Sequence, residues 1–281
     1  MTVFVKYNYD NNFVEFLPSD IRYQITNYYN VLYRIFGARF KKILVLGAGV
    51  GNDVAAALRN DVQTVDAVEI DPKIVDIGKG YHAEAPYASA SVHIHVADAR
   101  AFLHDPNNNG YDMIVFGALD SHIAFSSMSS IRLDNYVYTI ESFQDALRRL
   151  SPNGILAVTF YCYKTWQIER VFNALWRANG PKPIVVHSLG LWKNNLVMLG
   201  GPGAIREQLE AQTYVKEQRA DDLIGDGSVE PTSDDWPFLY LPSADFRFPI
   251  YQCLFSFSVS ATSPYDKRAM LRPQDSTGSC F

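Results

Sequence analysis

Apolar runs and amphipathic segments alternate over the first 200 residues of the chain. Short apolar runs such as residues 43–46 are typical of strands buried on both faces, whereas residues 139–150 have the period of an amphipathic helix. Strands that alternate with helices indicate a doubly wound, mostly parallel sheet of Rossmann-like α/β type. The pattern predicts seven strands, over residues 43–46, 64–68, 92–96, 111–116, 155–161, 183–187 and 195–199, and helices over residues 21–36, 54–58, 72–78, 139–150 and 165–178.

The two flanks of this pattern are less regular than its centre. We expect a helical N-terminal extension over residues 1–38, the Rossmann-like domain over residues 39–200, and an irregular C-terminal extension over residues 201–261. The last stretch, residues 262–281, has the composition of a disordered tail. The C-terminal extension contains the sequence DDWPFLY at residues 234–240, whose closely spaced acidic and aromatic residues are typical of a docking motif. We also expect loops over residues 79–91, 105–110, 151–154 and 221–233, and a polar helix over residues 204–220.

Three glycines follow the first predicted strand at alternating positions. Glycine lets the backbone turn sharply and lets a ligand approach the amides without an intervening Cβ. The helix that begins there offers its unpaired N–H groups to a ligand. The second strand ends in Glu69, at the spacing where a carboxylate accepts two ribose hydroxyls. The stretch therefore predicts a nucleoside site, with candidate residues in the turn at Gly47, Ala48, Gly49, Gly51 and Asp53.

Other candidate residues also fall where predicted strands end. Gly47, Glu69, Asp98 and Asp120 each lie at or just beyond the carboxyl end of a predicted strand. Doubly wound sheets bind their ligands beyond these ends. We therefore expect the four positions to meet at one edge of the sheet.

The spacing of the glycines separates two kinds of nucleotide site. A dinucleotide fingerprint has its third glycine three positions after the second, where this chain has Asn52. The G-x-G-x-G turn, followed by a strand that ends in VEID at residues 68–71, resembles the class I S-adenosylmethionine (SAM)-dependent methyltransferases and the related spermidine synthases. Residues 42–161 resemble the spermidine-synthase-like branch of that fold. The ending at residues 233–240 resembles bacterial spermidine-synthase-like proteins that often carry membrane helices.

The resemblance implies a role for each candidate at the strand ends. The glycines would hold the methionine portion of SAM or of decarboxylated SAM, and Glu69 would hold the ribose. Ile70 would pack on the adenine, and Asp98 with Ala99 would read the adenine amino edge. An apolar side chain suits the ring face, and a carboxylate accepts from hydroxyls and an exocyclic amine. Gly117, at the end of the fourth strand, completes the implied cofactor-binding set.

The acids that the resemblance implies for aminopropyl transfer are only partly present. Aminopropyltransferases resemble one another in two acids three residues apart after the fourth strand, and here these positions are Gly117 and Asp120. The acid usual within the glycine turn is replaced by Val50. An amine nucleophile must lose its proton to attack the carbon beside a sulfonium, so the missing acid matters. The candidate catalytic residues are Asp120, Ser121 and His122, with His122 as a base or as a loop histidine without a role.

The leading function is a transferase that uses SAM or decarboxylated SAM and moves a methyl or aminopropyl group to a small acceptor, with amines as one class. The protein would mainly supply proximity and alignment, because the sulfonium already activates the carbon. The alternative is a nucleoside-binding or scaffolding domain that has lost the chemistry. Asn52 disfavours a third class, a nicotinamide-dependent oxidoreductase.

Composition restricts the partners. A net charge of −5 without a basic cluster argues against nucleic acid. The three cysteines are spread out and odd in number, and the first residues lack a secretory signal pattern, so we expect the cytoplasm. The apolar run over residues 248–261 is too short and too polar to span a bilayer alone. Membrane association and a homodimer are left open.

Two histidines share one face of the third predicted strand. His93 and His95 alternate with apolar residues, and two residues of separation would suit a metal ion. No third ligand is evident nearby in the sequence, so we interpret them as solvated or hydrogen-bonded and predict no metal site.

Overall fold

The computed structural model describes residues 29–117, 119, 133–161, 164–187 and 195–241. The chain divides into a compact unit, Met1–Ser243, and a second unit, Ala244–Phe281. The second unit lies outside the described residues, as do the predicted tail and the apolar run at residues 248–261. No helix of the described part has both the length and the apolar character needed to cross a membrane.

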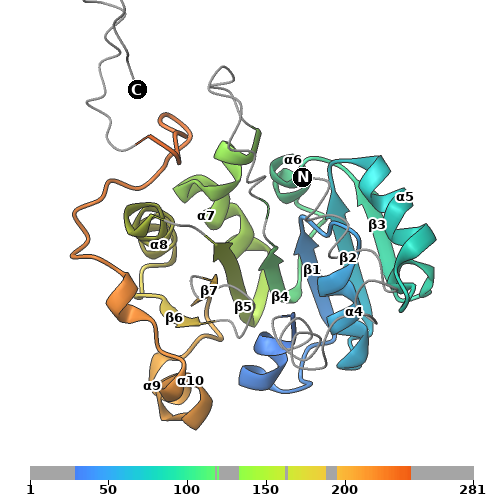
Figure 1. Ribbon diagram of the computed structural model, residues 1–281, viewed down its shortest axis with the longest axis horizontal. Helices are drawn as coiled ribbons and strands as arrows, with labels where there is room; N and C mark the ends of the chain where they lie inside the picture. Colours follow the sequence, from blue (N-terminus) through green and yellow to red (C-terminus); the bar gives the residue numbers. More distant parts are fainter. Residues whose placement is uncertain (1–28, 118, 120–132, 162–163, 188–194, 242–281) are drawn as a thin grey trace, which may run out of the picture. The chain divides into compact units, whose positions relative to one another are not determined.

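A seven-stranded sheet forms the centre of the first unit (Figure 1). Its order is β3-β2-β1-β4-β5-β7-β6; β7 pairs antiparallel with both β5 and β6, and the other neighbouring pairs are parallel. This confirms the doubly wound, mostly parallel sheet. The strand order reverses between β1 and β4, so the topological switch point, where such sheets bind ligands, lies at their carboxyl ends. The strands are β1 Lys42–Leu46, β2 Thr64–Glu69, β3 Val92–Val96, β4 Tyr111–Phe116, β5 Leu150–Tyr161, β6 Ile184–His187 and β7 Asn195–Gly200.

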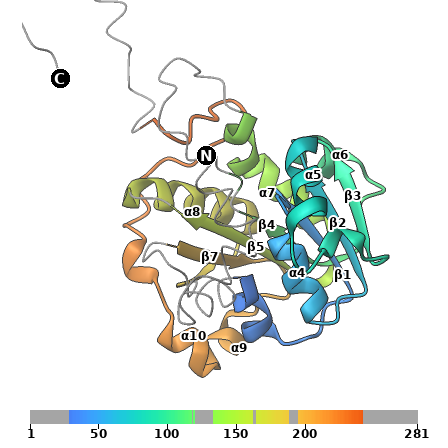
Figure 2. The ribbon, with the colours of Figure 1, turned by 45° about the vertical axis from the view of Figure 1, so that its right-hand side comes forward.

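Helices cover both faces of the sheet (Figures 1 and 2). Residues 29–36 are helical, end before Gly37 and pack with α4 on one face, whereas α6, α7 and α8 pack on the other. The helices are α4 Asn52–Arg59, α5 Pro72–Tyr81, α6 Ala99–His104, α7 Ile140–Arg149, α8 Thr165–Asn179, α9 Arg206–Ala211 and α10 Thr213–Glu217, with 3-10 turns η1 Pro86–Ala88, η2 Leu133–Tyr138 and η3 Asp221–Leu223.

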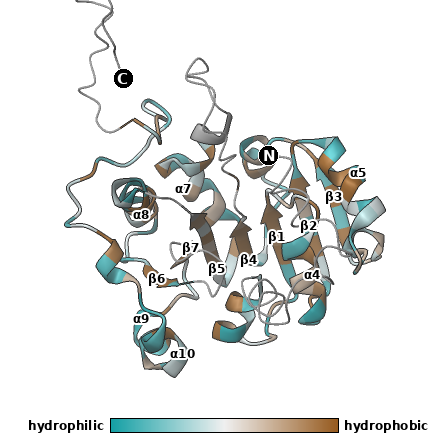
Figure 3. Ribbon diagram, viewed as in Figure 1, coloured by the Kyte–Doolittle hydropathy of each residue, from teal (hydrophilic) through white to brown (hydrophobic). Residues whose placement is uncertain are grey.

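Each face of the sheet has its own apolar core. Strands β1, β5 and β7 are largely hydrophobic, whereas β2, β3 and the helices carry both hydrophobic and hydrophilic residues (Figure 3). Because successive side chains of a strand point to opposite faces, Ile43 and Val45 enter one core and Leu44 and Leu46 the other. Continuous apolar runs therefore became fully covered strands, as the pattern predicts.

Three local expectations were wrong, and one helix was not predicted. Helix α6 was not predicted, because six residues are too few to display a helical period; the Asp98 side chain caps it by accepting from the Ala101 amide. Strand β5 includes residues 151–154, expected as a turn, and a register shift opposite Tyr111 accommodates them. The expected loop at residues 79–91 contains the end of α5 and η1, and the expected helix at 204–220 is broken at Gln212, where the backbone is extended.

Candidate functional site

The carboxyl ends of four neighbouring strands bring the predicted nucleoside-binding residues to one edge. Gly47 follows β1, Glu69 ends β2, Asp98 follows β3 and Gly117 follows β4. Because β3, β2, β1 and β4 are consecutive in the sheet (Figure 1), we infer that these residues follow one another along that edge. Asp120, Ser121 and His122 lie outside the described residues, so their predicted role is not tested.

The glycine turn needs the backbone conformations that glycine adopts most easily. Gly47, Gly49 and Gly51 have φ values of 71°, 56° and 101°, all in the left-handed region. A Cβ at Gly47 would collide with Leu119, and one at Gly51 would approach Pro86 to 2.7 Å. A Cβ at Gly49, by contrast, has its nearest neighbour at 4.0 Å, so the turn has open space at its middle glycine. That is where a ligand can approach the backbone.

Glu69 holds this turn against the second strand. Its Oε2 accepts from the Gly49 amide at 2.9 Å, and its Oε1 accepts from the Asp71 amide at 3.0 Å. The residue is 7% exposed. A carboxylate has about four acceptor sites, so two bonds leave capacity for ligand hydroxyls. Tyr87, which the sequence did not single out, fixes the same turn by donating its hydroxyl to the Gly49 carbonyl at 2.7 Å.

Ile70 directly follows Glu69 at the end of β2, and Asp98 follows the neighbouring strand β3. Ile70 is 50% exposed, although it is a large apolar residue next to a buried strand. Asp98 uses its Oδ1 to cap α6, and Ala99 is buried behind it. An exposed apolar side chain can cover a flat ring, and a carboxylate can accept from an exocyclic amino group. The arrangement therefore suits an adenine.

Gly117 packs tightly at the β4 end of the row. A Cβ there would lie 3.0 Å from the Gly47 carbonyl oxygen and 3.2 Å from that of Leu46. The same position lies 3.5 Å from Oδ2 of Asp53, in the first turn of α4. Burial raises the pKa of the Asp53 carboxyl to about 7. The strand end that lacks an acid is thus next to an acid from the adjacent helix.

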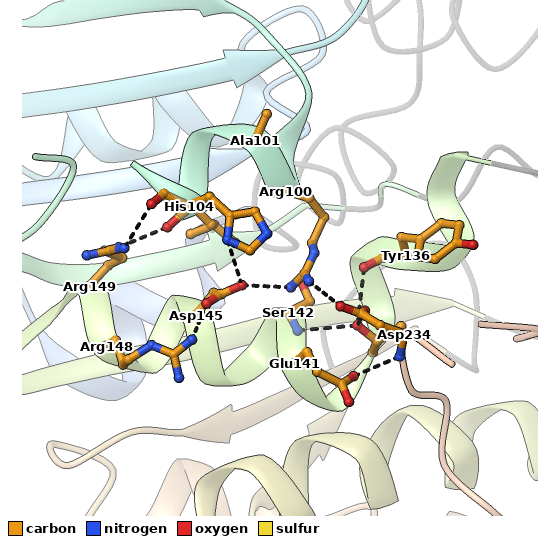
Figure 4. A network of polar contacts seen from close by, with 12 residues as sticks. Arg100, Ala101, His104, Tyr136, Glu141, Ser142, Asp145, Arg148, Arg149 and Asp234 are labelled. Carbon is orange, nitrogen blue, oxygen red and sulfur yellow. Dashed lines mark hydrogen bonds and ion pairs between the residues drawn. The ribbon is translucent and has the colours of Figure 1, made fainter. Parts of the chain in front are cut away.

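The C-terminal motif contacts the helix that follows Asp98. Arg100 of α6 binds Asp145 of α7 at 2.9 Å and Asp234 of the motif at 2.6 Å (Figure 4). Asp234 also accepts from the Thr139 hydroxyl, and its amide donates to Glu141 (Figure 4). The network therefore connects the motif to the helix whose first turn carries the predicted adenine-reading residues.

A second contact of the motif surrounds a buried arginine. Arg170 of α8 is 1% exposed, and its guanidinium lies 4.9 Å from the Trp166 ring and 4.8 Å from the Trp236 ring. Burial lowers the pKa of Arg170 to about 10, so it stays cationic at neutral pH. The docking interpretation of the motif fits both contacts. Sequence reasoning missed Arg100 and Arg170, because an arginine in a helix gives no sign of its partner far along the chain.

One of the two histidines of β3 has a polar partner. His95 contacts Asp66 at 2.9 Å, in agreement with the hydrogen-bonded interpretation. Within the part of the chain that the structure describes, no three His, Cys, Asp or Glu residues form a group suited to a metal ion.

Comparison with known proteins finds one family model, the spermine/spermidine synthase domain, which matches residues 32–172, half of the chain. A polyamine aminopropyltransferase of Alkaliphilus oremlandii is 31% identical over 121 residues, which are 42% of this chain and 39% of that protein. Spermidine synthase 2 of Hyoscyamus niger is 27% identical over 119 residues, which are 41% and 36%. The match thus spans less than half the length of these curated relatives.

Two solved structures share the fold. A spermidine synthase in complex with the transition-state analogue AdoDATO has a TM-score of 0.55 at 12% identity, with 77% of this chain and 73% of that chain covered. Spermidine synthase from Thermotoga maritima has a TM-score of 0.55 at 13% identity, with 77% and 72% covered.

Proposed function

The chain belongs to the spermine/spermidine synthase domain family, and on that basis we propose that it is a transferase that takes an alkyl group from a sulfonium nucleoside. The co-substrate is SAM or decarboxylated SAM, and the acceptor is a small molecule, with amines as the leading class. The observation that carries the proposal is the link between Glu69 and the glycine turn, because it places free carboxylate acceptors beside open backbone.

The residues at the carboxyl edge of the sheet fit such a nucleoside in one orientation, with its adenine toward β3 and the chain on its sulfur toward β4. Ile70 and Asp98 receive the adenine, Glu69 accepts from the ribose hydroxyls, and the turn at Gly49 meets the chain attached to the 5′ sulfur. This order follows the strands from β3 to β4. Asp120 remains the proposed acceptor-holding acid, with Ser121 and His122 beside it. The cytoplasm stays the proposed compartment.

The protein's own contribution to the reaction is alignment. The sulfonium supplies the chemistry by activating its carbon toward attack. An acceptor nitrogen forms a bond to that carbon as the carbon–sulfur bond breaks, the electron pair stays on the leaving sulfur, and the nitrogen loses a proton to a base. Holding the reactants in line replaces a bimolecular encounter with an internal step, which is where a positioning site gains most of its rate.

Isothermal titration tests this proposal. We expect SAM or decarboxylated SAM, and also methylthioadenosine, to bind with micromolar dissociation constants, and NAD to bind at least about 100-fold more weakly, because the turn lacks the third glycine of a dinucleotide site. Incubation with a bound sulfonium nucleoside and a panel of diamines should then yield an alkylated amine. Binding of NAD alone would contradict the proposal. Nucleoside binding without product from any acceptor would favour a binding domain. The glycine at position 117, where aminopropyltransferases have an acid, agrees with that alternative.

Replacing Glu69 with glutamine should weaken nucleoside binding by about 1.5–3 kcal/mol, the usual contribution of hydrogen bonds to a charged group. The amide keeps the size of the side chain but loses the charge and one pair of acceptor sites. Titration with methylthioadenosine measures the effect. Glu84→Gln, which changes an exposed acid paired with Arg59, is the matched control. Equal affinities of the Glu69→Gln and Glu84→Gln proteins would remove Glu69 from the site.

A further inference from the structure

The C-terminal strap, which comprises residues 229–241, is attached to the start of α7 by buried polar groups. Thr232 donates its hydroxyl to the Tyr138 carbonyl, and its own carbonyl accepts from the Ile140 amide at 3.0 Å. Both Thr232 and Tyr138 are fully buried, so water does not replace a partner that either of them loses. The strap is therefore fixed at the junction of η2 and α7.

Tyr138 connects this junction to the carboxyl edge of the sheet. Its hydroxyl accepts from the Leu119 amide at 3.2 Å, and Leu119 follows Gly117 and the end of β4. The Leu119 side chain in turn lies against the glycine turn, because a Cβ on Gly47 would collide with it. The path from Thr232 to the turn after β1 thus consists of groups in direct contact.

Asp234 forms a second connection, to the first turn of α6. Its Oδ2 accepts from Arg100 at 2.6 Å, and the Arg100 side chain is only 12% exposed (Figure 4). Arg100 comes shortly after Asp98, the residue that caps α6 at the end of β3. A helix of six residues has little stability of its own, so its position depends on such contacts. The strap therefore reaches both the β3 end and the β4 end of the carboxyl edge.

A separate set of contacts holds the strap on α8. Arg170 donates to the Glu230 carbonyl at 2.9 Å, and Asn173 donates to the Val229 carbonyl at 2.7 Å. These bonds attach the strap at a distance in sequence from Asp234, so losing the contact between Asp234 and α6 should not release it. The connections to the carboxyl edge can thus be tested without detaching the strap.

We propose that the C-terminal strap positions the carboxyl edge for nucleoside binding, through Arg100 at the β3 end and through Tyr138 at the β4 end. Asp234 and Thr232 act through these partners, so they are positioning residues. The proposal rests on the proposed function, because it concerns the same nucleoside site. It gives the strap a part in ligand binding, although the strap lies beyond the residues that the family model matches.

Coupling of this kind is reciprocal. If the attached strap strengthens ligand binding, the bound ligand must strengthen the attachment of the strap by the same factor. The two connections should therefore be visible from either side: as faster hydrogen exchange in the strap when the ligand is absent, and as weaker binding when a connection is removed.

Hydrogen exchange of the wild-type protein measures the first effect without any variant. The Asp234 amide donates to Glu141 at 2.9 Å, and we expect saturating methylthioadenosine to slow its exchange at least about fivefold. The Gly203 amide, which donates to the Gly154 carbonyl at 2.9 Å near the opposite edge of the sheet, should exchange at an unchanged rate. This second amide is the control for general stabilisation by the ligand.

Asp234→Asn tests the connection at the β3 end. The variant loses the charge that faces Arg100 but keeps an oxygen for the Thr139 hydroxyl, and the side chain is 38% exposed, so the melting temperature should fall by no more than about 4 °C. We expect isothermal titration to show methylthioadenosine affinity lower by at least about fivefold. Asp234→Glu, which keeps the charge, should recover most of that affinity. Asp235→Asn, at the exposed acid next in the chain, should bind as wild type.

Tyr138→Phe tests the connection at the β4 end. The ring stays in the core but the Leu119 amide loses its acceptor, so we again expect affinity lower by at least about fivefold. Tyr111→Phe is the matched control, because Tyr111 is 1% exposed and donates its hydroxyl to Asp66 at 2.9 Å, at the amino end of β4. It should lower the melting temperature about as much as Tyr138→Phe and leave methylthioadenosine affinity intact.

The outcomes separate the two proposals. If neither methylthioadenosine nor a sulfonium nucleoside binds the wild-type protein, the proposed function fails, and the positioning role fails with it. If they bind, but methylthioadenosine slows the Asp234 amide no more than the Gly203 amide, only the positioning role is overturned. Wild-type affinity in both Asp234→Asn and Tyr138→Phe also overturns it.

Discussion

Replacing Gly49 with valine is expected to abolish nucleoside binding, lowering affinity by at least about 100-fold, or about 2.7 kcal/mol. Gly49 has φ +56°, and its open side has no heavy atom closer than 4.0 Å to a built Cβ. A valine would fill the space where a ligand meets the backbone, and a β-branched residue is strained at positive φ. Titration with methylthioadenosine measures the loss.

A matched glycine separates this effect from strain. Gly110, in the turn before β4, has φ +74° and likewise open space around a Cβ, but it lies at the amino end of the strand. Gly110→Val should lower the melting temperature about as much as Gly49→Val while leaving ligand affinity intact. Binding retained in the Gly49→Val protein, with a native circular dichroism spectrum, would mean that the ligand does not use this turn.

Replacing Arg170 with methionine is expected to lower the free energy of unfolding by about 3 kcal/mol or more. The guanidinium is almost fully buried, and its removal takes a donor from several carbonyl groups, at about 1–3 kcal/mol for each group that is left buried and unpaired. It also removes a cation from between Trp166 and Trp236. The carbonyls that accept from Arg170 belong to Glu230, Phe238, Leu239 and Leu241.

Urea unfolding followed by tryptophan emission measures the change, because two of the rings contact the substituted residue. Arg177→Met is the control on the same helix: its side chain is 58% exposed and reaches Glu230 at 3.5 Å, so we expect a change within about 0.5 kcal/mol. If the two variants were equally stable, the C-terminal motif would not depend on Arg170 for its attachment.

Local patterns in the sequence were sufficient to predict most strands of the sheet. A strand or helix period is set by residues a few positions apart, so β1, β2, β4 and α8 follow from apolar spacing alone. The glycine turn was equally predictable, since its positive φ angles depend on residue type. Because parallel strands end at a common edge, the meeting of Gly47, Glu69 and Asp98 followed from the fold class.

Tertiary structure alone decided which distant residues became partners. Arg100 and Asp234 are 134 positions apart, and no local pattern relates them. Likewise, the sequence named Gly117 as a missing acid and Asp53 as a turn residue, but only the folded chain brings the first turn of α4 to the end of β4 and so places the second beside the first. Helix α6 depends on the same kind of information, because its six residues gain their stability from Phe102 and Leu103 packing on the sheet. Local sequence sets conformation over a few residues, whereas the burial, charge and partners of a side chain depend on segments that only folding brings together.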